Sequence, residues 1–315
     1  MFWLTLFGQR MGHDQAKHMR HLVVSTEAQN LRTKDGKLFS GERSIALSTI
    51  GSIQCFGNSH NWSQSALTAS AEHCPVVLSA WSGTAEKWRT ASILPRGQYV
   101  NPEAIYRLCR LSAKESTQLA SGLLLTKVAN QMLLLRDADP TLPPAPPIQQ
   151  GSFARVLRLE ASYARKFWPK YFAGISSDII RREKYRSTQP INIALSYGYG
   201  FLYHAVEWAC LAHGLDCSVG LIHKLRRNRP SLACDLIEPL RCAVELTVMR
   251  YREDMLEKSR MASRFAEMLE QKFIYRNSAF RLRTIIRLMV ESFIKAICGR
   301  TEFHPFLLHA RDACL

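Results

Sequence analysis

The spacing of apolar residues changes once along this chain, near residues 94–100, and this change limits the folds that the chain can adopt. Before it, short apolar runs alternate with turn residues, and after it apolar residues recur at helical intervals. The connecting stretch LPRGQYV carries Pro and Gly, and the following Asn101 and Pro102 suit a helix N-cap and first turn. We therefore predict an α+β fold with a domain boundary near residue 98.

Residues 1–98 predict a small β-rich domain. Its expected strands contain LVVS, SIALS, SIQCF and VVLSAW, together with a hairpin in TKDGKLF. Asp35-Gly36 predicts a type I′ turn in that hairpin, because this turn requires positive φ at both central residues. The polar, alanine-rich residues 62–73 suit one short helix. Residues 1–20 lie outside the pattern, and we interpret them as a disordered arm or as sequence that precedes the true start.

Residues 99–315 predict a larger all-helical domain. We expect helices near residues 152–168, 191–213, 231–273 with an interruption, and 279–298. Gly214 suits the left-handed residue that ends the second of these helices. Residues 137–152 hold five prolines between Pro140 and Pro147, which excludes a helix and predicts an extended surface loop.

The charge of the chain favours a polyanionic partner. Lys and Arg number 42 against 26 Asp and Glu, a formal net charge of +16 with a pI of about 9.7. Residues 1–150 carry 15 basic against 10 acidic side chains, net +5, and residues 151–315 carry 27 against 16, net +11. Because many basic side chains can engage many phosphates at once, nucleic acid is favoured over small acidic metabolites.

Cysteine usage and hydropathy predict a reduced, aqueous compartment. Nine Cys without a CxxC pair fit neither a disulfide framework nor a zinc site, so we expect a cytoplasmic protein. The opening MFWLTLFG is short and has no preceding basic region, unlike a signal peptide. No apolar run approaches the roughly 20 residues of a spanning helix, so we expect no membrane association.

One segment, residues 220–241, combines acidic and basic candidates for chemistry. Its basic residues are Lys224, Arg226, Arg227 and Arg229. It also contains His223, Asp235 and Glu238, and the two acids are three residues apart, so on a helix both carboxylates would share one face. Pro239 removes a backbone donor, so we expect local distortion beside these acids.

A further acid, Glu160, lies at helical spacing with Val156, Ala164 and Phe167 and should point inward. Taken singly, such an acid is more often part of a structural ion pair, and a lone His is more often a buried, hydrogen-bonded residue. Together, one His and two or three carboxylates form an oxygen and nitrogen ligand set that suits Mg²⁺ or Mn²⁺. We expect the basic residues, Arg165 included, to bind the phosphates that such an ion activates.

Residues 192–241, which begin NIALSYGYGFLYHAVEWACLAHGLDCSVGLIHK and end SLACDLIEPLR, resemble the CRISPR-associated adaptation integrase family, the first Cas protein. Further similarity lies in residues 157–172, in TKVANQ at residues 126–131 and in IGSIQCFGN at residues 50–58. Together these stretches extend over most of residues 22–299.

The resemblance implies a fold, an assembly and a metal site. It implies a β-rich N-terminal domain, a helical catalytic domain and a homodimer. It also implies that Glu160, His223 and Glu238 are the metal ligands, with Asp235 as a nearby acid that contributes to the same site in part of the family. Many relatives have Gly where this chain has Ala161 and Asp where it has Glu238, so the choice of third ligand between Asp235 and Glu238 stays open.

The activity that the resemblance implies is DNA integration. The 3′ hydroxyl of a captured DNA fragment, the spacer, attacks a phosphodiester of the CRISPR repeat, and the ion stabilises the transferring phosphate. Hydrolytic cleavage is the same chemistry with water as the nucleophile. The implied partners are double-stranded DNA and a small ferredoxin-like adaptation subunit that bridges two dimers.

Two other functions fit the residues alone. A non-catalytic helical nucleic-acid-binding protein would use the basic half for phosphates and the acids for structural ion pairs. A stand-alone, structure-selective DNA nuclease in repair would share the chemistry and differ in substrate and partner. A metal site made of thiolates is disfavoured, because the spacings of the candidate cysteines match no zinc pattern. These cysteines are Cys210, Cys217, Cys234 and Cys242. A second His/Glu pair, His204 and Glu207, is expected to pack in the core rather than to bind a metal.

Overall fold

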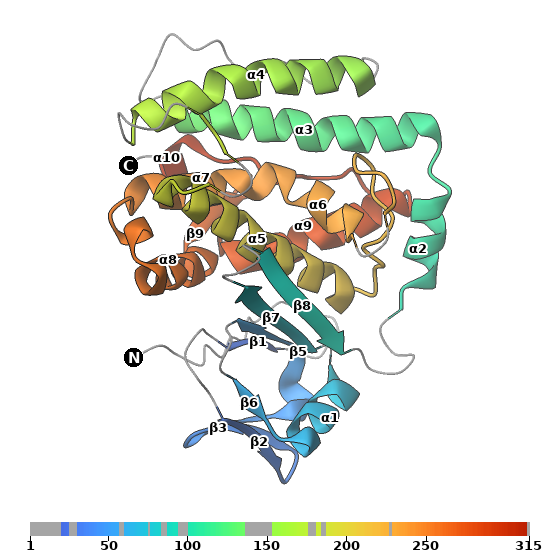
Figure 1. Cartoon of the computed structure of the whole chain (residues 1–315). Coiled ribbons are helices and arrows are strands. Elements are labelled where there is room, and N and C mark those ends of the chain that lie inside the picture. The colour runs from blue at the N-terminus through green and yellow to red at the C-terminus, as the bar shows by residue number, and fades with distance from the viewer. Residues whose placement is uncertain are drawn as a thin grey trace. The chain divides into compact units, whose positions relative to one another are not determined.

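The structure is a computed structural model (Figure 1), and it describes residues 20–24, 30–56, 60–74, 76–82, 87–93, 100–135, 153–175, 181–183, 187–226 and 229–313. Two compact units divide the chain, Met1–Asn101 with Leu211–Leu215, and Pro102–Cys210 with Asp216–Leu315. The first is called the N-terminal unit and the second the helical unit. The expected arm of residues 1–20, apart from Arg20, and the proline-rich residues 137–152 lie outside the described residues.

The described residues of the N-terminal unit form two four-stranded sheets. One sheet has the order β1-β5-β7-β8, in which β1, β5 and β7 run parallel and β8 runs antiparallel to β7. Its strands are Arg20–Val24, Ile50–Phe56, Val76–Ser82 and Lys87–Ile93. The other has the order β4-β3-β2-β6, with strands Arg43–Ala46, Lys37–Ser40, Asn30–Lys34 and Asn61–Trp62. The β-rich N-terminal part of the predicted α+β fold is confirmed.

The predicted hairpin turn forms between β2 and β3. Asp35 and Gly36 have φ of 50° and 69°, the left-handed values that a type I′ turn needs. The run SIALS is only partly a strand, because β4 ends at Ala46 and a 3₁₀ turn, η1, covers Leu47–Thr49. Strand β8 was not predicted, because its sequence KWRTASI has neither a continuous apolar run nor a strict alternation of apolar and polar residues.

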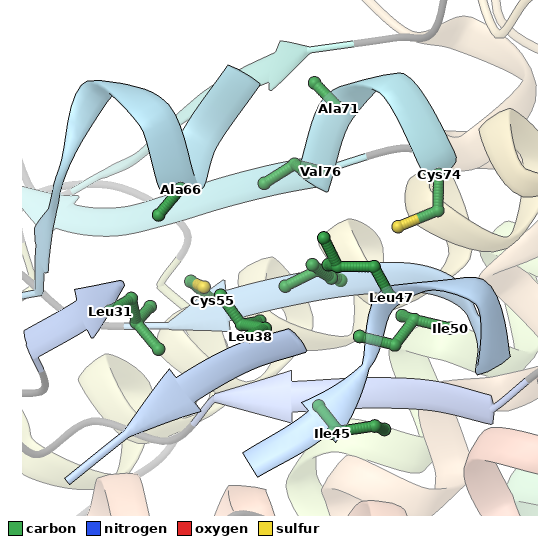
Figure 2. Packing of buried hydrophobic residues seen from close by; sticks show 11 residues of the cluster. Leu31, Leu38, Ile45, Leu47, Ile50, Cys55, Ala66, Ala71, Cys74 and Val76 are labelled. Carbon is green, nitrogen blue, oxygen red and sulfur yellow. The ribbon is translucent and has the colours of Figure 1, made fainter. Parts of the chain in front are cut away.

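A helix and one face of the strands enclose the core of the N-terminal unit. Helix α1, Gln64–His73, begins where Ser63 Oγ accepts a hydrogen bond of 3.1 Å from the Ala66 amide, which is an N-cap. Figure 2 shows buried side chains of the strands, of the turn η1, and of α1 with its C-cap residue packed together. They are Leu31, Leu38, Ile45, Leu47, Ile50, Cys55, Ala66, Ala71, Cys74 and Val76.

Where the structure describes it, the helical unit consists of helices and one hairpin. The longer helices are α2 (Pro102–Cys109), α3 (Ala113–Leu135), α4 (Phe153–Ala173), α5 (Pro190–Ala212), α7 (Arg241–Arg250), α8 (Lys258–Glu270) and α9 (Leu282–Ile297). The shorter ones are α6 (Ser231–Leu236), α10 (Ala310–Ala313) and the 3₁₀ turns η2 (Glu238–Leu240) and η3 (Asp254–Leu256). Gly214, with φ of 73°, follows α5 as predicted.

The expectation that all regular elements after residue 99 are helices is wrong at residues 272–281. Strands β9 (Lys272–Tyr275) and β10 (Ser278–Arg281) form an antiparallel hairpin, so the helix expected from residue 279 begins only at Leu282. Arg276 and Asn277 have φ of 51° and 65°, which lets the chain reverse within two residues.

Helix α3 lies at the centre of the contacts that form the site. In Figure 1, α3 and α4 run side by side, and α3 also contacts η2, α6 and α7. The predicted distortion at Pro239 is present, because α6 ends at Leu236 and Glu238 opens the 3₁₀ turn η2. In the described part of the chain, no helix is both long and apolar enough to cross a membrane.

Candidate metal and DNA site

Lys127 of α3 joins two of the predicted acids. Its Nζ donates a hydrogen bond of 2.6 Å to Oε1 of Glu160 on α4 and lies 2.9 Å from Oε2 of Glu238 at the start of η2. The exposed side-chain fractions are 15% for Lys127, 21% for Glu160 and 7% for Glu238. Three segments of the chain therefore bring two carboxylates to one cationic group with little access to water.

Burial and charge act in opposite directions on these groups. Burial would raise the pKa of Glu238, but Arg241 and Lys127 outweigh it and lower that pKa to about 2. Burial would lower the pKa of Lys127, yet Glu238 and Glu160 outweigh both burial and the repulsion from Arg241, so this pKa is raised. The pairs therefore hold Glu238 ionised and Lys127 protonated at neutral pH.

The two oxygens of Glu238 have different surroundings. Oε1 lies 3.0 Å from Nη2 of Arg241, whose guanidinium lies over the Tyr199 ring at 4.6 Å. Oε2 lies 2.9 Å from Nζ of Lys127, and no other donor in the described part of the chain forms a hydrogen bond with it. One oxygen is thus paired with an arginine and the other with a lysine.

Two further polar residues of α3 hold the segments around Glu238. Asn130 Nδ2 donates hydrogen bonds of 2.7 Å to Pro239 O and 2.8 Å to Phe306 O, and Asn130 Oδ1 accepts one of 2.8 Å from the Leu308 amide. Gln131 Nε2 donates one of 2.8 Å to Glu245 Oε1 on α7. Because these residues lie three and four positions after Lys127, one face of α3 supplies all the contacts.

Glu245 is a second buried acid, one that the sequence analysis did not single out. Oε1 also accepts a hydrogen bond of 2.7 Å from the Tyr199 hydroxyl, and the Tyr171 hydroxyl donates to its main-chain oxygen at 2.9 Å. Burial raises the pKa of Glu245, and the hydrogen bonds from Tyr199 and Gln131 only reduce that shift. Glu245 thus fixes the hydroxyl of Tyr199, the residue whose ring lies under the Arg241 guanidinium.

Asp235 holds the loop that carries His223. Its Oδ1 accepts a hydrogen bond from the His223 amide at 3.2 Å and lies 2.5 Å from His223 Nδ1. Its Oδ2 accepts from the amides of Leu221 and Ile222 at 2.5 and 2.9 Å. The Asp235 side chain is fully buried while that of His223 is 27% exposed, so the acid is bound to the loop and the imidazole reaches the surface.

Gly220 allows the loop to lie against Asp235. A Cβ at this position would stand 2.7 Å from both Asp235 Oδ2 and His223 O, closer than real Cβ atoms come to such groups. The main chain at Gly220 therefore passes where no side chain fits.

The structure brings the predicted ligands together as two pairs. Glu160 and Glu238 meet at Lys127, and His223 meets Asp235. Across the described ranges, no three His, Cys, Asp or Glu side chains lie close enough to hold one metal ion. The donor chemistry still fits a divalent cation, because the two carboxylates already converge on one cationic group, the ammonium of Lys127. With Nδ1 directed to Asp235, Nε2 is the His223 nitrogen left for a metal.

The predicted DNA-binding residues are mostly at the surface. Lys224 and Arg226 are exposed on the loop after His223, Arg165 is exposed on α4, and Arg229 is half-buried. Burial raises the pKa of the Cys234 thiol, and the nearby Arg229 reduces that rise. Arg227 lies outside the described residues.

Most of the other residues considered from sequence are buried, whereas Cys234 and Glu207 are half-buried. Cys210, Cys217 and Cys242 are buried free thiols. The thiol of Cys234 is also free. His204 Nδ1 lies 3.1 Å from Glu207 Oε2 within buried helix α5.

A sequence model of one family matches most of the chain. This family is described as "CRISPR associated protein Cas1", and the match covers residues 17–274. The chain belongs to the Cas1 family. The "CRISPR-associated endonuclease Cas1 2" of Rhodospirillum rubrum is 29% identical over 261 residues, 71% of this chain and 73% of that relative. The "CRISPR-associated endonuclease Cas1 1" of Pyrobaculum aerophilum is 33% identical over 124 residues, 39% of this chain but only 40% of that relative.

Solved structures share the fold of this Cas1 family member. A "Casposase bound to integration product" has a TM-score of 0.73 at 20% identity, over 93% of this chain and 95% of that one. A "Cas6-RT-Cas1--Cas2 complex" has a TM-score of 0.68 at 16% identity, over 95% of this chain and 37% of that one. The predicted family and the predicted order of a β-rich part before a helical part are both confirmed.

Sequence reasoning missed Lys127, Asn130 and Gln131 as site residues, although their segment TKVANQ contributed to the resemblance. A signal was available, because these three polar residues interrupt the apolar run LLLTKVANQMLLL. Polar groups within an apolar helix need partners when they are buried, so their spacing already indicated a polar contact surface on α3.

Proposed function

We propose that this Cas1 family member is a metal-dependent DNA integrase and endonuclease. It inserts captured DNA fragments into a CRISPR array when the 3′ hydroxyl of a fragment attacks a phosphodiester of the repeat. The observation that carries the proposal is the convergence of Glu160 and Glu238 on one cation position, with oxygens 2.6 and 2.9 Å from Lys127 Nζ. Two carboxylates directed at one cation, within a strongly basic protein that attracts phosphates, suit phosphodiester chemistry.

Glu160, Glu238 and His223 hold a divalent ion, Mg²⁺ or Mn²⁺, in this proposal. The ion, when bound, stabilises charge on the transferring phosphate and orients the attacking oxygen. Asp235 is assigned a positioning role, because its two oxygens are bound to the loop of residues 221–223. It fixes which nitrogen of His223 faces the ion, which leaves Glu238 as the third ligand.

The exposed basic residues bind the DNA backbone. Lys224, Arg226 and Arg229 lie on or next to the His223 loop, Arg165 follows Glu160 on α4, and Arg227 is included by its place in the sequence. Charge reversal of Arg226 and Arg227 should weaken duplex binding and reduce its salt dependence, because fewer counterions are released. The same reversal at exposed Arg252 is the control, and equal losses in both variants would contradict this assignment.

A homodimer and a small ferredoxin-like subunit complete the proposed assembly. Support comes from the shared fold with a chain of a Cas1–Cas2 complex. The double-stranded DNA substrates are the captured fragment and the CRISPR repeat.

The test is strand transfer of a short labelled duplex into a supercoiled plasmid that carries a CRISPR repeat, with the small partner subunit present. Reactions contain Mn²⁺, Mg²⁺ or EDTA, and compare the wild type with His223→Ala and with His309→Ala, an exposed histidine as control. Joining should require metal, disappear in His223→Ala and persist in His309→Ala.

The other outcomes separate the alternative functions. Metal-dependent cutting without joining would indicate a stand-alone nuclease. DNA binding with neither joining nor cutting would indicate a non-catalytic nucleic-acid-binding protein and would overturn the proposal.

A further inference from the structure

Lys127 contacts two of the carboxylates that are the proposed ligands of the metal ion. Its ammonium lies within 2.9 Å of one oxygen from each of Glu160 and Glu238, and these are two of the three proposed ligands. A divalent ion bound by the same two oxygens would be only a few ångströms from that ammonium. The lysine and the metal therefore draw on the same pair of carboxylates.

The contact on the Glu238 side is one that another cation can replace. Lys127 Nζ is 2.9 Å from Glu238 Oε2, and apart from Lys127 no donor in the described part of the chain forms a hydrogen bond with this oxygen. Arg241 meanwhile fixes the other oxygen at 3.0 Å and itself lies over Tyr199. Arg241 thus holds one oxygen of the carboxylate, while the other oxygen has Lys127 as its cationic partner, a place that another cation could take.

The charges of the cluster are balanced by the lysine. Glu160 and Glu238 carry two negative charges, and Lys127 and Arg241 carry two positive ones. A divalent ion added to this balanced set would leave an excess of two positive charges in a largely buried place. Like charges a few ångströms apart repel strongly at a partly buried site, so the ion and the ammonium compete for the carboxylates.

We propose that Lys127 is an internal cation that competes with the catalytic metal. It holds Glu160 and Glu238 in place while no metal is bound, and it must give up these oxygens when the ion binds. The competition sets how much free metal the protein needs before its site fills. This inference rests on the proposed function, since it concerns the same ligands.

A purely structural role and a competing role of Lys127 predict opposite changes in metal affinity when the lysine is replaced. If Lys127 only maintained the geometry of the ligands, its loss would misplace Glu160 and Glu238 and weaken metal binding. If it competes, its loss removes a positive charge next to the ion and strengthens metal binding. The sign of the change in metal affinity therefore separates the two roles.

The affinity for Mn²⁺ is measured by titration of the full chain with MnCl₂ alone. Binding is followed by calorimetry or by the electron paramagnetic resonance signal of free Mn²⁺. Lys127→Met removes the charge at similar length, and Lys127→Gln keeps a neutral donor toward Glu160 in case the first variant does not fold. Lys114→Met removes an exposed lysine from the same helix as a control. Glu160→Gln tests whether the ion sits at this site.

The inference predicts that Mn²⁺ binds Lys127→Met or Lys127→Gln roughly tenfold or more tightly than the wild type, whereas Lys114→Met is unchanged. In EDTA, Lys127→Met should melt at a lower temperature than the wild type, and Mn²⁺ should restore most of the loss. Equal or weaker binding in the Lys127 variants, with binding still lost in Glu160→Gln, would overturn the competition and leave the proposed metal site in place. Absence of Mn²⁺ binding in the wild type and both Lys127 variants would overturn both proposals.

A measurement on the wild type covers the case in which neither variant folds. Reductive methylation of Lys127, followed by mass spectrometry, should increase several-fold when Mn²⁺ is added, because the ammonium is released from its two carboxylates. Lys114 should react equally with and without the ion. An unchanged rate at Lys127 with Mn²⁺ bound would overturn the inference.

Discussion

The side-chain amide of Asn130 donates a hydrogen bond of 2.7 Å to the main-chain carbonyl of Pro239, the residue that follows Glu238. The same side chain also bonds Phe306 O and the Leu308 amide, each at 2.8 Å. One fully buried residue of α3 thus joins the turn that presents Glu238 to the C-terminal segment.

Replacement of Asn130 by Leu should strongly destabilise the protein. It leaves two carbonyl groups and one amide buried without partners, at about 1 kcal/mol each, so the free energy of unfolding should fall by about 3 kcal/mol. Urea titration followed by circular dichroism measures this change. Gln118→Leu alters an exposed residue of the same helix and serves as control, with an expected change below about 0.5 kcal/mol. Equal changes in the two variants would argue against this role of Asn130.

The same Gly→Ala substitution should have opposite effects at two positions. At Gly220 the new Cβ would press on Asp235 Oδ2 and His223 O at 2.7 Å, so Gly220→Ala should lower the free energy of unfolding by about 2 kcal/mol. At Gly122, within α3, a Cβ meets nothing within 4 Å, so Gly122→Ala should raise it by about 1 kcal/mol. Thermal denaturation of both variants tests the pair, and a neutral Gly220→Ala would mean that the loop can move aside.

Glu238 should make the protein less stable in acid. Burial acts to raise its pKa, but Arg241 and Lys127 lower it from 4.5 to about 2. Because the folded value lies below the unfolded one, the stabilisation is present above about pH 4.5 and is lost as the pH falls toward 2, on the order of 3 kcal/mol in total. Unfolding titrations from about pH 6 to about pH 3 should therefore give a steeper loss for the wild type than for Glu238→Gln. Parallel curves would refute this.

Glu245 should have the opposite pH dependence. Burial raises its folded pKa above the ordinary 4.5, so its contribution is fully present below that value and is lost as the pH rises through the folded pKa. Glu245→Gln keeps the shape and an acceptor for Tyr199 and Gln131 but cannot ionise. Its melting temperature relative to the wild type should therefore increase with pH, whereas the exposed control Glu253→Gln should show a constant difference. A difference that shrinks with rising pH would exclude a destabilising charge at Glu245.

The local features of this fold were predictable because they depend on neighbouring residues. The positive φ of Asp35 and Gly36, the end of α5 at Gly214 and the break at Pro239 each follow from the conformational limits of the residues themselves. The β9–β10 hairpin escaped prediction because KFIY is a short apolar run that fits a strand or a buried helix equally well.

The sequence by itself also supplied the chemical types at the site, namely Glu160, His223, Asp235 and Glu238 within a basic chain. Only the tertiary structure decided their partners. It placed Lys127 between Glu160 and Glu238, and it separated Asp235 from Glu238 by directing one to the His223 loop and the other to Lys127 and Arg241. Such contacts join segments that are far apart in the chain, and they depend on how α3 packs against α4, η2 and α7. The local spacing of apolar residues does not specify this packing.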